Sequence, residues 1–173
     1  MSPAGREPPR IVLDELFMLD GPRMEDAAAH RRFALDPEAA RFFRWSIEEA
    51  RAAPDSHYVE GMRDFIRGWK TGARLSLAIR RIADGEAVGT VELRPRGEEA
   101  DVSYLVIPEL RGQGLASRSV AAALAWGVKE LGLRRARIGC DVENVASRRV
   151  AEKCGFVLIG KYGTDLVFVR DLP

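Results

Sequence analysis

The chain has 173 residues, which is the size of one ordinary domain. Its 27 Lys and Arg residues nearly balance its 26 Asp and Glu residues, and the net charge of +1 argues against a dedicated nucleic-acid-binding protein. No stretch approaches the roughly 20 apolar residues of a membrane span, and the N-terminus lacks the apolar core of a signal peptide. We therefore expect a cytoplasmic protein with no nucleic-acid or membrane partner.

The cysteines and histidines do not suggest a metal site. Cys140 and Cys154 are too few for a disulfide scaffold and lack metal-ligand spacing. His30 and His57 lie far apart in the sequence. We expect a protein without a bound metal.

The N-terminal part predicts a strand followed by helices. Residues 1–9 are polar and proline-rich, and we expect a flexible tail ahead of a single domain over residues 10–173. The apolar segment from Ile11 to Leu19 predicts a first strand. Residues 23–72 are rich in Ala, Arg and Glu with two breaks at proline, and predict two or three short helices. Their aromatic residues either line a substrate cleft or, as the simpler reading, pack the helices onto a sheet.

The remaining chain alternates between strand and helix patterns. Apolar residues of period two predict strands, and apolar residues spaced by three and four predict helices. The expected strands are 75–80, 88–93, 100–107, 136–142, 156–162 and 165–170, and the expected helices are 114–131 and 145–154. Since no repeat or internal linker interrupts this series, the sequence predicts one α+β domain.

The segment from Tyr104 to Ala116 carries the strongest chemical signal, a glycine-rich turn between a predicted strand and a predicted helix. Such a turn offers unpaired backbone N–H groups at a positive helix end, which favours phosphate or pyrophosphate. Gly112 and Gly114 let a ligand approach the backbone closely. The helix start lacks the Gly-Lys-Ser/Thr of a P-loop, and Ser117 stands where a dinucleotide-binding fingerprint needs glycine.

The pattern Arg111-x-x-Gly114-x-Ala116 resembles the Arg/Gln-x-x-Gly-x-Gly/Ala motif of the GNAT acetyltransferases, whose loop cradles the pyrophosphate of coenzyme A. The resemblance is strong over residues 74–162. It implies a GNAT-like α+β fold: a mixed, mostly antiparallel, twisted sheet of about seven strands with a splayed parallel pair, flanked by helices. It also implies acetyl-CoA as acyl donor.

A second segment resembles one branch of that family, the N-terminal acetyltransferases of bacterial ribosomal proteins. Asn144-x-x-Ser147 is followed by a Lys-x-Gly-Phe segment that ends at Phe156. The resemblance implies that Asn144 binds the cofactor arm and that Ser147 lies at the sulfur. Helix capping by both residues is the alternative.

The resemblance assigns the rest of the cofactor site. The pantetheine arm would pair with the main chain of the strand that ends near residue 107, and the pyrophosphate would meet the loop and the helix start. Arg111 would bind a phosphate, unless it is an ordinary solvated arginine. The implied cofactor-binding residues are Leu105, Val106, Ile107, Arg111, Gly112, Gln113, Gly114, Leu115, Ala116, Ser117, Asn144 and Ser147.

For catalysis, we expect Ser147 to protonate the leaving thiolate as general acid. Glu92 and Asp101 are the candidate bases for the attacking amine, with Tyr104 in support. The resembled branch can carry an acidic residue in the final hairpin, where this chain offers only Asp165. The two cysteines are interpreted as packed thiols rather than as nucleophiles.

Three functions stay open. The leading hypothesis is transfer of an acetyl group from acetyl-CoA to a primary amine, an α-amino group of a protein or peptide, by direct attack in a ternary complex. The second is acetylation of a small amine such as an antibiotic, a polyamine or an amino acid. The third is a non-catalytic acyl-CoA-binding module. Dimers are common in the resembled family, so a homodimer is also kept open.

Overall fold

The structure, a computed structural model, describes residues 2–173. The described residues form one eight-stranded sheet in the order β1-β2-β3-β4-β5-β6-β8-β7. Its strands are β1 (Ile11–Val12), β2 (Phe17–Asp20), β3 (Leu75–Arg81), β4 (Ala87–Arg96), β5 (Glu99–Val106), β6 (Arg135–Asp141), β7 (Val157–Tyr162) and β8 (Asp165–Asp171). Neighbouring strands are antiparallel except β5 and β6, which confirms the predicted mixed sheet with one parallel pair.

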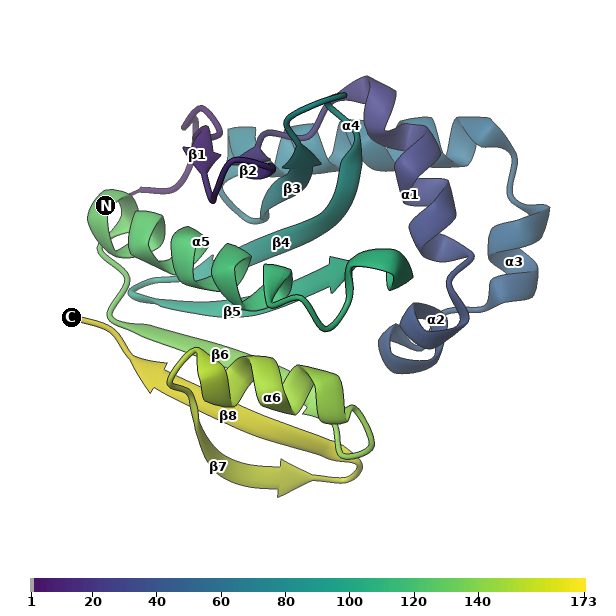
Figure 1. Cartoon of the computed structure of the whole chain (residues 1–173). Helices are drawn as coiled ribbons and strands as arrows, with labels where there is room; N and C mark the ends of the chain where they lie inside the picture. Colours follow the sequence, from purple (N-terminus) through teal and green to yellow (C-terminus); the bar gives the residue numbers. More distant parts are fainter. Residues whose placement is uncertain (1) are drawn as a thin grey trace.

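Helices lie on both faces of this sheet. They are α1 (Ala27–Ala34), α2 (Pro37–Phe43), α3 (Ile47–Ala52), α4 (Asp55–Thr71), α5 (Leu115–Leu131) and α6 (Val145–Lys153), with short 3-10 turns at Met24–Asp26 and Pro108–Leu110. In Figure 1, α5 and α6 cover the near face, α4 lies behind the sheet, and α1 to α3 gather at one end.

The predicted first strand over Ile11–Leu19 is instead a short hairpin of β1 and β2. The Asp14 carboxylate accepts hydrogen bonds from the backbone N–H groups of Leu16 and Phe17, both at 2.8 Å, and the chain reverses there. An aspartate that bonds the backbone a few residues on favours a turn over a strand. The sheet therefore has eight strands rather than about seven.

The N-terminal helical part has four helices rather than two or three. Asp36 begins α2, because its side chain accepts a hydrogen bond from the Glu38 N–H, and Pro54 precedes α4. Ser46 begins α3 by accepting from the Glu49 N–H at 3.1 Å. Ser46 therefore adds a helix start between the two proline breaks, in a stretch that the breaks alone predicted as one helix.

The core forms where α5 meets β4 and β5. Leu93 and Val102 are paired across these strands and are both buried. Gly127 of α5 permits close approach, since a Cβ there would lie 2.7 Å from the side chain of Leu133 and 3.3 Å from that of Leu93. The glycine is therefore needed for the fit between α5 and the sheet.

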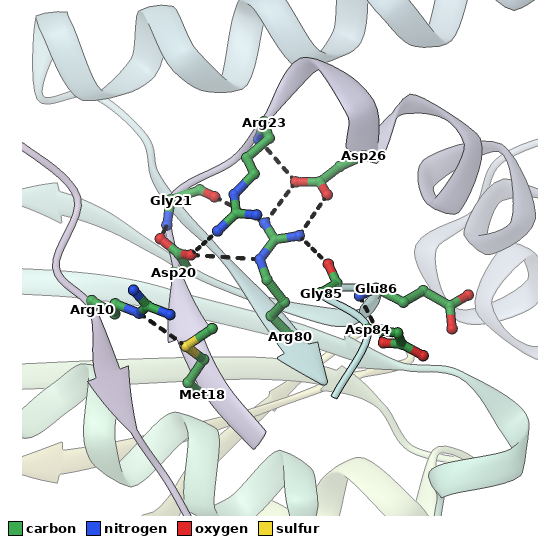
Figure 2. Close-up of polar contacts among 10 residues, drawn as sticks. All are labelled: Arg10, Met18, Asp20, Gly21, Arg23, Asp26, Arg80, Asp84, Gly85 and Glu86. Atoms are coloured by element: carbon green, nitrogen blue, oxygen red, sulfur yellow. Dashed lines mark hydrogen bonds and ion pairs between the residues drawn. The ribbon is translucent and has the colours of Figure 1, made fainter. Parts of the chain in front are cut away.

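A buried arginine ties the β2–α1 connection to the β3–β4 turn (Figure 2). Arg80 of β3 is 1% exposed. Its guanidinium donates to the two carboxylate oxygens of Asp26 at 2.9 and 3.0 Å. It also donates to the carbonyls of Gly85, at 2.8 Å, and Gly21, at 3.2 Å. The charge of Arg80 is thus compensated inside the protein by fixed acceptors.

The residues ahead of β1 contact the two long helices. The Gly5 N–H donates to the Lys70 carbonyl at 3.0 Å, and Arg6 pairs with Glu130 of α5 at 3.1 Å. The N-terminal segment therefore lies along α4 and α5.

Candidate functional site

A cleft of about 440 Å³ lies where β5 and β6 part. The two strands pair only over Glu99–Asp101 and Arg135–Arg137, and then diverge (Figure 1). Because α5 and α6 follow these strands, the first turns of both helices line the cleft, and α2 lies at its open end. The predicted splayed parallel pair is thus present and frames an open site.

Backbone groups of β5 face the cleft at alternate residues. The Ile107 N–H donates to the Val88 carbonyl at 3.0 Å, and its carbonyl closes the following 3-10 turn. Since alternate residues of an antiparallel strand direct their backbone groups to opposite edges, those of Tyr104 and Val106 point toward β6. Both backbone groups of Ile107 are therefore bonded within the protein, and its place in the cofactor site stays a prediction.

The glycine-rich loop forms one end of the cleft. Gly112 and Gly114 have positive φ angles of 75° and 73°, and Gly114 begins α5. The first N–H groups of α5 have no partner within the helix. A Cβ on Gly114 would lie 3.3 Å from Lys153 Nζ and 3.6 Å from Arg118 Nη1. The loop thus combines free donors, a helix N-terminus and two cations, which suits a pyrophosphate.

Tyr104 and Ser147 meet across the cleft from β5 and α6. Their hydroxyl oxygens are 2.7 Å apart, and the Tyr104 hydroxyl also donates to the Ser147 carbonyl at 3.1 Å. Asn144 accepts a hydrogen bond from the Ser147 N–H at 2.9 Å and begins α6. Burial raises the pKa of Tyr104 well above its usual value, so this hydroxyl keeps its proton at neutral pH.

The two cysteines are buried thiols. Cys140 lines the cleft beside Ser147, and Cys154 lies against the Ser117 carbonyl at 3.4 Å. Burial raises the pKa of both thiols, so the reactive thiolate is disfavoured at neutral pH.

The predicted base Glu92 lies outside the cleft. Its pairing partner on β3 is Ser76, whose hydroxyl donates to it at 2.5 Å. Arg74 and Arg94 also donate to this carboxylate, and Arg74 lies 4.4 Å from the Phe65 ring of α4. Glu92 therefore points to the α4 face of the sheet, where its charge is compensated.

The predicted base Asp101 lies at the closed end of the parallel pair. It faces Arg137 across the β5–β6 register and forms ion pairs with Arg96 at 2.9 Å and with Arg137 at 3.7 Å. It does not line the cleft. Strand alternation predicts which residues share a face, but not how far along a splayed pair they lie.

Arg111 contacts carboxylates at the start of α2. It donates to Asp36 and, at 2.7 Å, to Glu38, while its Nε donates to the Val106 carbonyl at 3.0 Å. All three guanidinium nitrogens are therefore engaged by the protein itself.

The acidic residue of the final hairpin is also paired. Asp165 accepts from Arg44 at 2.5 Å, and Arg44 lies 3.6 Å from Asp141. A hydrogen bond from the Glu143 N–H, with Arg44 in support, holds the pKa of Asp141 below its usual value. The Asp141 carboxylate is thus a weak base.

The cleft gathers most of the predicted site residues but not all. Those that line it are Tyr104, Leu105, Val106, Arg111, Gly112, Gly114, Leu115, Ala116, Ser117, Asn144 and Ser147. Gln113 turns its side chain to the Glu109 carbonyl at 3.1 Å. Of the aromatic residues, Phe33 and Trp69 are buried in the core, whereas Phe42 and Phe43 of α2 line the cleft.

The sequence interpretation missed Arg118 and Lys153 as neighbours of the loop. Arg118 follows Gly114 by one helical turn, which places it over the loop; this spacing was the available signal. Lys153 belongs to the Lys-x-Gly-Phe segment but comes from the end of α6. Its proximity to Gly114 depends on tertiary packing.

Within residues 2–173, no group of three or more His, Cys, Asp or Glu side chains is arranged to hold a metal ion. None of the helices there is long and apolar enough to cross a membrane.

Comparison with known protein families identifies the class. The acetyltransferase (GNAT) domain family matches residues 17–157, which is most of the chain. The chain therefore belongs to the GNAT acetyltransferase family, as its loop motif predicted.

Solved structures with the same fold include the branch that the second motif resembles. The ribosomal L7/L12 α-N-protein acetyltransferase RimL, in complex with coenzyme A, has a TM-score of 0.81 at 19% identity, over 95% of this chain and 98% of that one. An acetyltransferase of Salmonella typhimurium that modifies the N-terminal serine of L7/L12 has a TM-score of 0.80 at 19% identity, over 95% and 100%. At such identities the likeness concerns the fold.

Other similar proteins are named for, or bound to, small molecules. The microcin C7 self-immunity acetyltransferase MccE, in complex with acetyl-CoA and AMP, has a TM-score of 0.78 at 16% identity, over 92% of this chain and 94% of that one. Spermidine N(1)-acetyltransferase of Escherichia coli (strain K12) is 32% identical over 81 residues. That match spans 45% of this chain and 44% of the enzyme's length.

Proposed function

We propose that this protein transfers an acetyl group from acetyl-CoA to a primary amine, the α-amino group of a protein or peptide. The observation that carries the proposal is the cleft between β5 and β6, with a pyrophosphate-suited loop at one end and the Tyr104–Ser147 pair beside it. The fold that it shares with N-terminal acetyltransferases supports this acceptor class.

The cofactor would lie along the cleft. Its pyrophosphate meets the N–H groups of residues 112–117, with Arg118 and Lys153 as flanking cations. Its pantetheine arm pairs with the backbone groups of Tyr104 in the manner of an added strand, while the Val106 carbonyl keeps its hydrogen bond from Arg111. Asn144 contributes its side-chain amide from the start of α6.

The reaction is a direct displacement at the thioester. The amine nitrogen bonds to the carbonyl carbon, and the Val106 N–H stabilises the oxyanion that forms. The carbon–sulfur bond then breaks, and its electron pair leaves with the sulfur. Ser147 donates its hydroxyl proton to this thiolate, water takes the amine proton, and Ser147 is reprotonated from that water. Tyr104 holds the Ser147 hydroxyl in place by a hydrogen bond.

An assay of free thiol release tests the acceptor. We expect turnover with a peptide that has a free N-terminus and little with the same peptide blocked there. Because water removes the proton, kcat/KM should rise with pH up to the α-amino pKa of about 7.7 to 8.0.

Turnover of spermidine in place of the peptide would establish the small-amine alternative. The partial spermidine acetyltransferase match and the cleft residues Phe42 and Phe43 favour that alternative. Binding of acetyl-CoA without any turnover would indicate a non-catalytic module.

Substitution of Ser147 tests its role. Ser147→Ala should lower kcat by about 10²-fold, the lower range for loss of a general acid, with the Kd of acetyl-CoA nearly unchanged. Ser103→Ala is the matched control, since Ser103 lines the same cleft but bonds to Arg94 instead. Equal effects of the two substitutions would contradict the assignment.

We also propose that the protein forms a homodimer in which β7, the strand at one edge of the sheet, pairs with a second copy of the chain. Its Val157, Leu158 and Ile159 are 67%, 50% and 62% exposed. An apolar strand with a free edge favours pairing with a second copy. Light scattering should give twice the monomer mass, and Ile159→Lys should give the monomer; a monomeric wild type would refute this pairing.

A further inference from the structure

Helix α2 lies beside the diverging ends of β5 and β6 (Figure 1), and several of its residues line the cleft. At its start, Asp36 and Glu38 accept hydrogen bonds from Arg111, which follows β5. At its end, Arg41 donates to Glu143 at 2.6 Å, in the connection between β6 and α6. The two ends of α2 therefore bind opposite sides of the splayed pair.

The conformation at the end of α2 directs a further cation to the second wall. Arg44 has a φ of 60°, the one positive value among the described non-glycine residues, which is uncommon for a residue with a Cβ. It pairs with Asp165 at 2.5 Å and donates to the Thr164 hydroxyl at 3.0 Å. The five ion pairs found for described residues 36–44 join α2 and its flanking residues to Arg111 on one side, and to Asp141, Glu143 and Asp165 on the other.

The inner side of α2 belongs to the cleft. Ala39, Phe42 and Phe43 line it together with the β5 residues Ser103 and Leu105. An acceptor that reaches the thioester from this end must pass these aromatic rings. The position of α2 therefore sets the width of the acceptor entrance.

All three guanidinium nitrogens of Arg111 already donate hydrogen bonds to protein acceptors in this arrangement. If its guanidinium turned to a phosphate, the Asp36 carboxylate, 8% exposed, would keep its charge without the cation. A buried carboxylate without its partner is strongly unfavourable. The geometry favours an arginine that stays on α2 when the cofactor binds.

We propose that Arg111 is a positioning residue that fixes α2 to the cofactor loop, so that acyl-CoA binding orders the acceptor entrance. This rests on the proposed function. The loop that receives the pyrophosphate and the helix that borders the acceptor then move as one unit. Arg111 influences acceptor use through Asp36 rather than through contact with the cofactor.

Two substitutions separate this role from phosphate binding. Asp36→Asn keeps the oxygen that caps α2 but removes the charge, and Arg111→Gln removes the guanidinium. We expect both to raise the acceptor KM by about tenfold or more and to leave the Kd of acetyl-CoA within about threefold. Asp36→Asn removes the charge from one contact, and Arg111→Gln removes the contacts to both Asp36 and Glu38. Arg135→Gln is the matched control, because Arg135 pairs with Asp171 at the closed end of the sheet.

Hydrogen exchange gives a readout that does not depend on turnover. Acetyl-CoA should slow exchange of the α2 amides in the wild type and in Arg135→Gln, but not in Asp36→Asn. A rise of about tenfold or more in the acetyl-CoA Kd for Arg111→Gln alone would identify a phosphate ligand and overturn the inference. So would unchanged α2 exchange in a wild type that binds acetyl-CoA. A wild type that does not bind acetyl-CoA would instead refute the proposed function, and this inference with it.

Discussion

The carboxylate of Glu92 is held by Ser76 and by two arginines on the face of the sheet that carries α4. Both of its oxygens accept hydrogen bonds, and the residue is 4% exposed. Such a group stabilises the fold and is poorly placed to take a proton from an amine in the cleft.

Glu92→Gln should therefore lower stability more than activity. We expect a loss of about 1 to 3 kcal/mol of unfolding free energy, because Arg74 and Arg94 lose their charged acceptor, which is itself buried. Urea unfolding would measure it. In thiol release, kcat/KM at a temperature where the variant is folded should stay within about threefold of the wild type, whereas loss of a general base costs roughly 10²- to 10⁴-fold. A loss of that larger size would restore Glu92 as the base.

His30 links the stability of the fold to pH. It packs against the rings of Phe33 and Phe65, with Asp26, Arg74 and Glu92 as the nearby charged groups. Burial lowers its pKa from 6.5 to about 4. The unfolded chain therefore binds a proton between these values when the folded one does not, and stability falls as the pH drops from 6.5 to 4.

The corresponding variant is His30→Gln. From about 1.36 kcal/mol per pKa unit, His30 should account for a loss of about 2 to 3 kcal/mol across this window in the wild type. Thermal unfolding at pH 7, 5.5 and 4.5 should reveal a shallower pH dependence in the variant. Equal slopes for the two proteins would refute the assignment. His57→Gln is the control.

The motif residues were predictable because their roles are local. Gly112 and Gly114 adopt positive φ where a turn enters a helix, and Asn144 caps the helix that carries Ser147. Glu92 was not predictable in the same way. Its face follows from strand alternation, but only the packing of α4 and the partners it brings determine that this face is away from the cleft.

At the scale of elements, apolar periodicity predicted the order of strands and helices after residue 74. It predicted the number of strands and helices before residue 74 less well. The apolar residues on both sides of Asp14 predicted one strand. Apolar periodicity carries no information about the hydrogen bond from the Leu16 N–H to the Asp14 side chain, which makes the turn. The role of α2 depends on ion pairs between residues far apart in the chain. Arg41 and Glu143 are an example, and no local pattern reports such a contact.

The connection between β2 and α1 depends on the buried cluster in Figure 2. Arg80→Met should remove about 3 to 5 kcal/mol of stability, because Asp26 then keeps a buried charge without its partner. Addition of Asp26→Asn should recover part of that loss, which chemical denaturation of the single and double variants would measure. Additive losses from Arg80 and Asp26 would contradict the coupling between them.

At the scale of the whole molecule, a single sheet that splays between β5 and β6 brings three elements to one cleft. The strand supplies backbone groups, the start of α5 supplies the loop, and α6 supplies Ser147. This arrangement depends on α5 and α6 both following the diverging strands. We propose that acetyl-CoA binds there.

Calorimetric titration with acetyl-CoA tests that claim most directly, on the wild type, Gly114→Trp and Gly97→Trp. Gly97 is the matched control, since it has a similar positive φ of 67° but lies in the open β4–β5 turn. We predict micromolar binding by the wild type and by Gly97→Trp, and none by Gly114→Trp, whose indole would fill the loop. Absence of binding by the folded wild type, or unchanged binding by Gly114→Trp, would contradict the account.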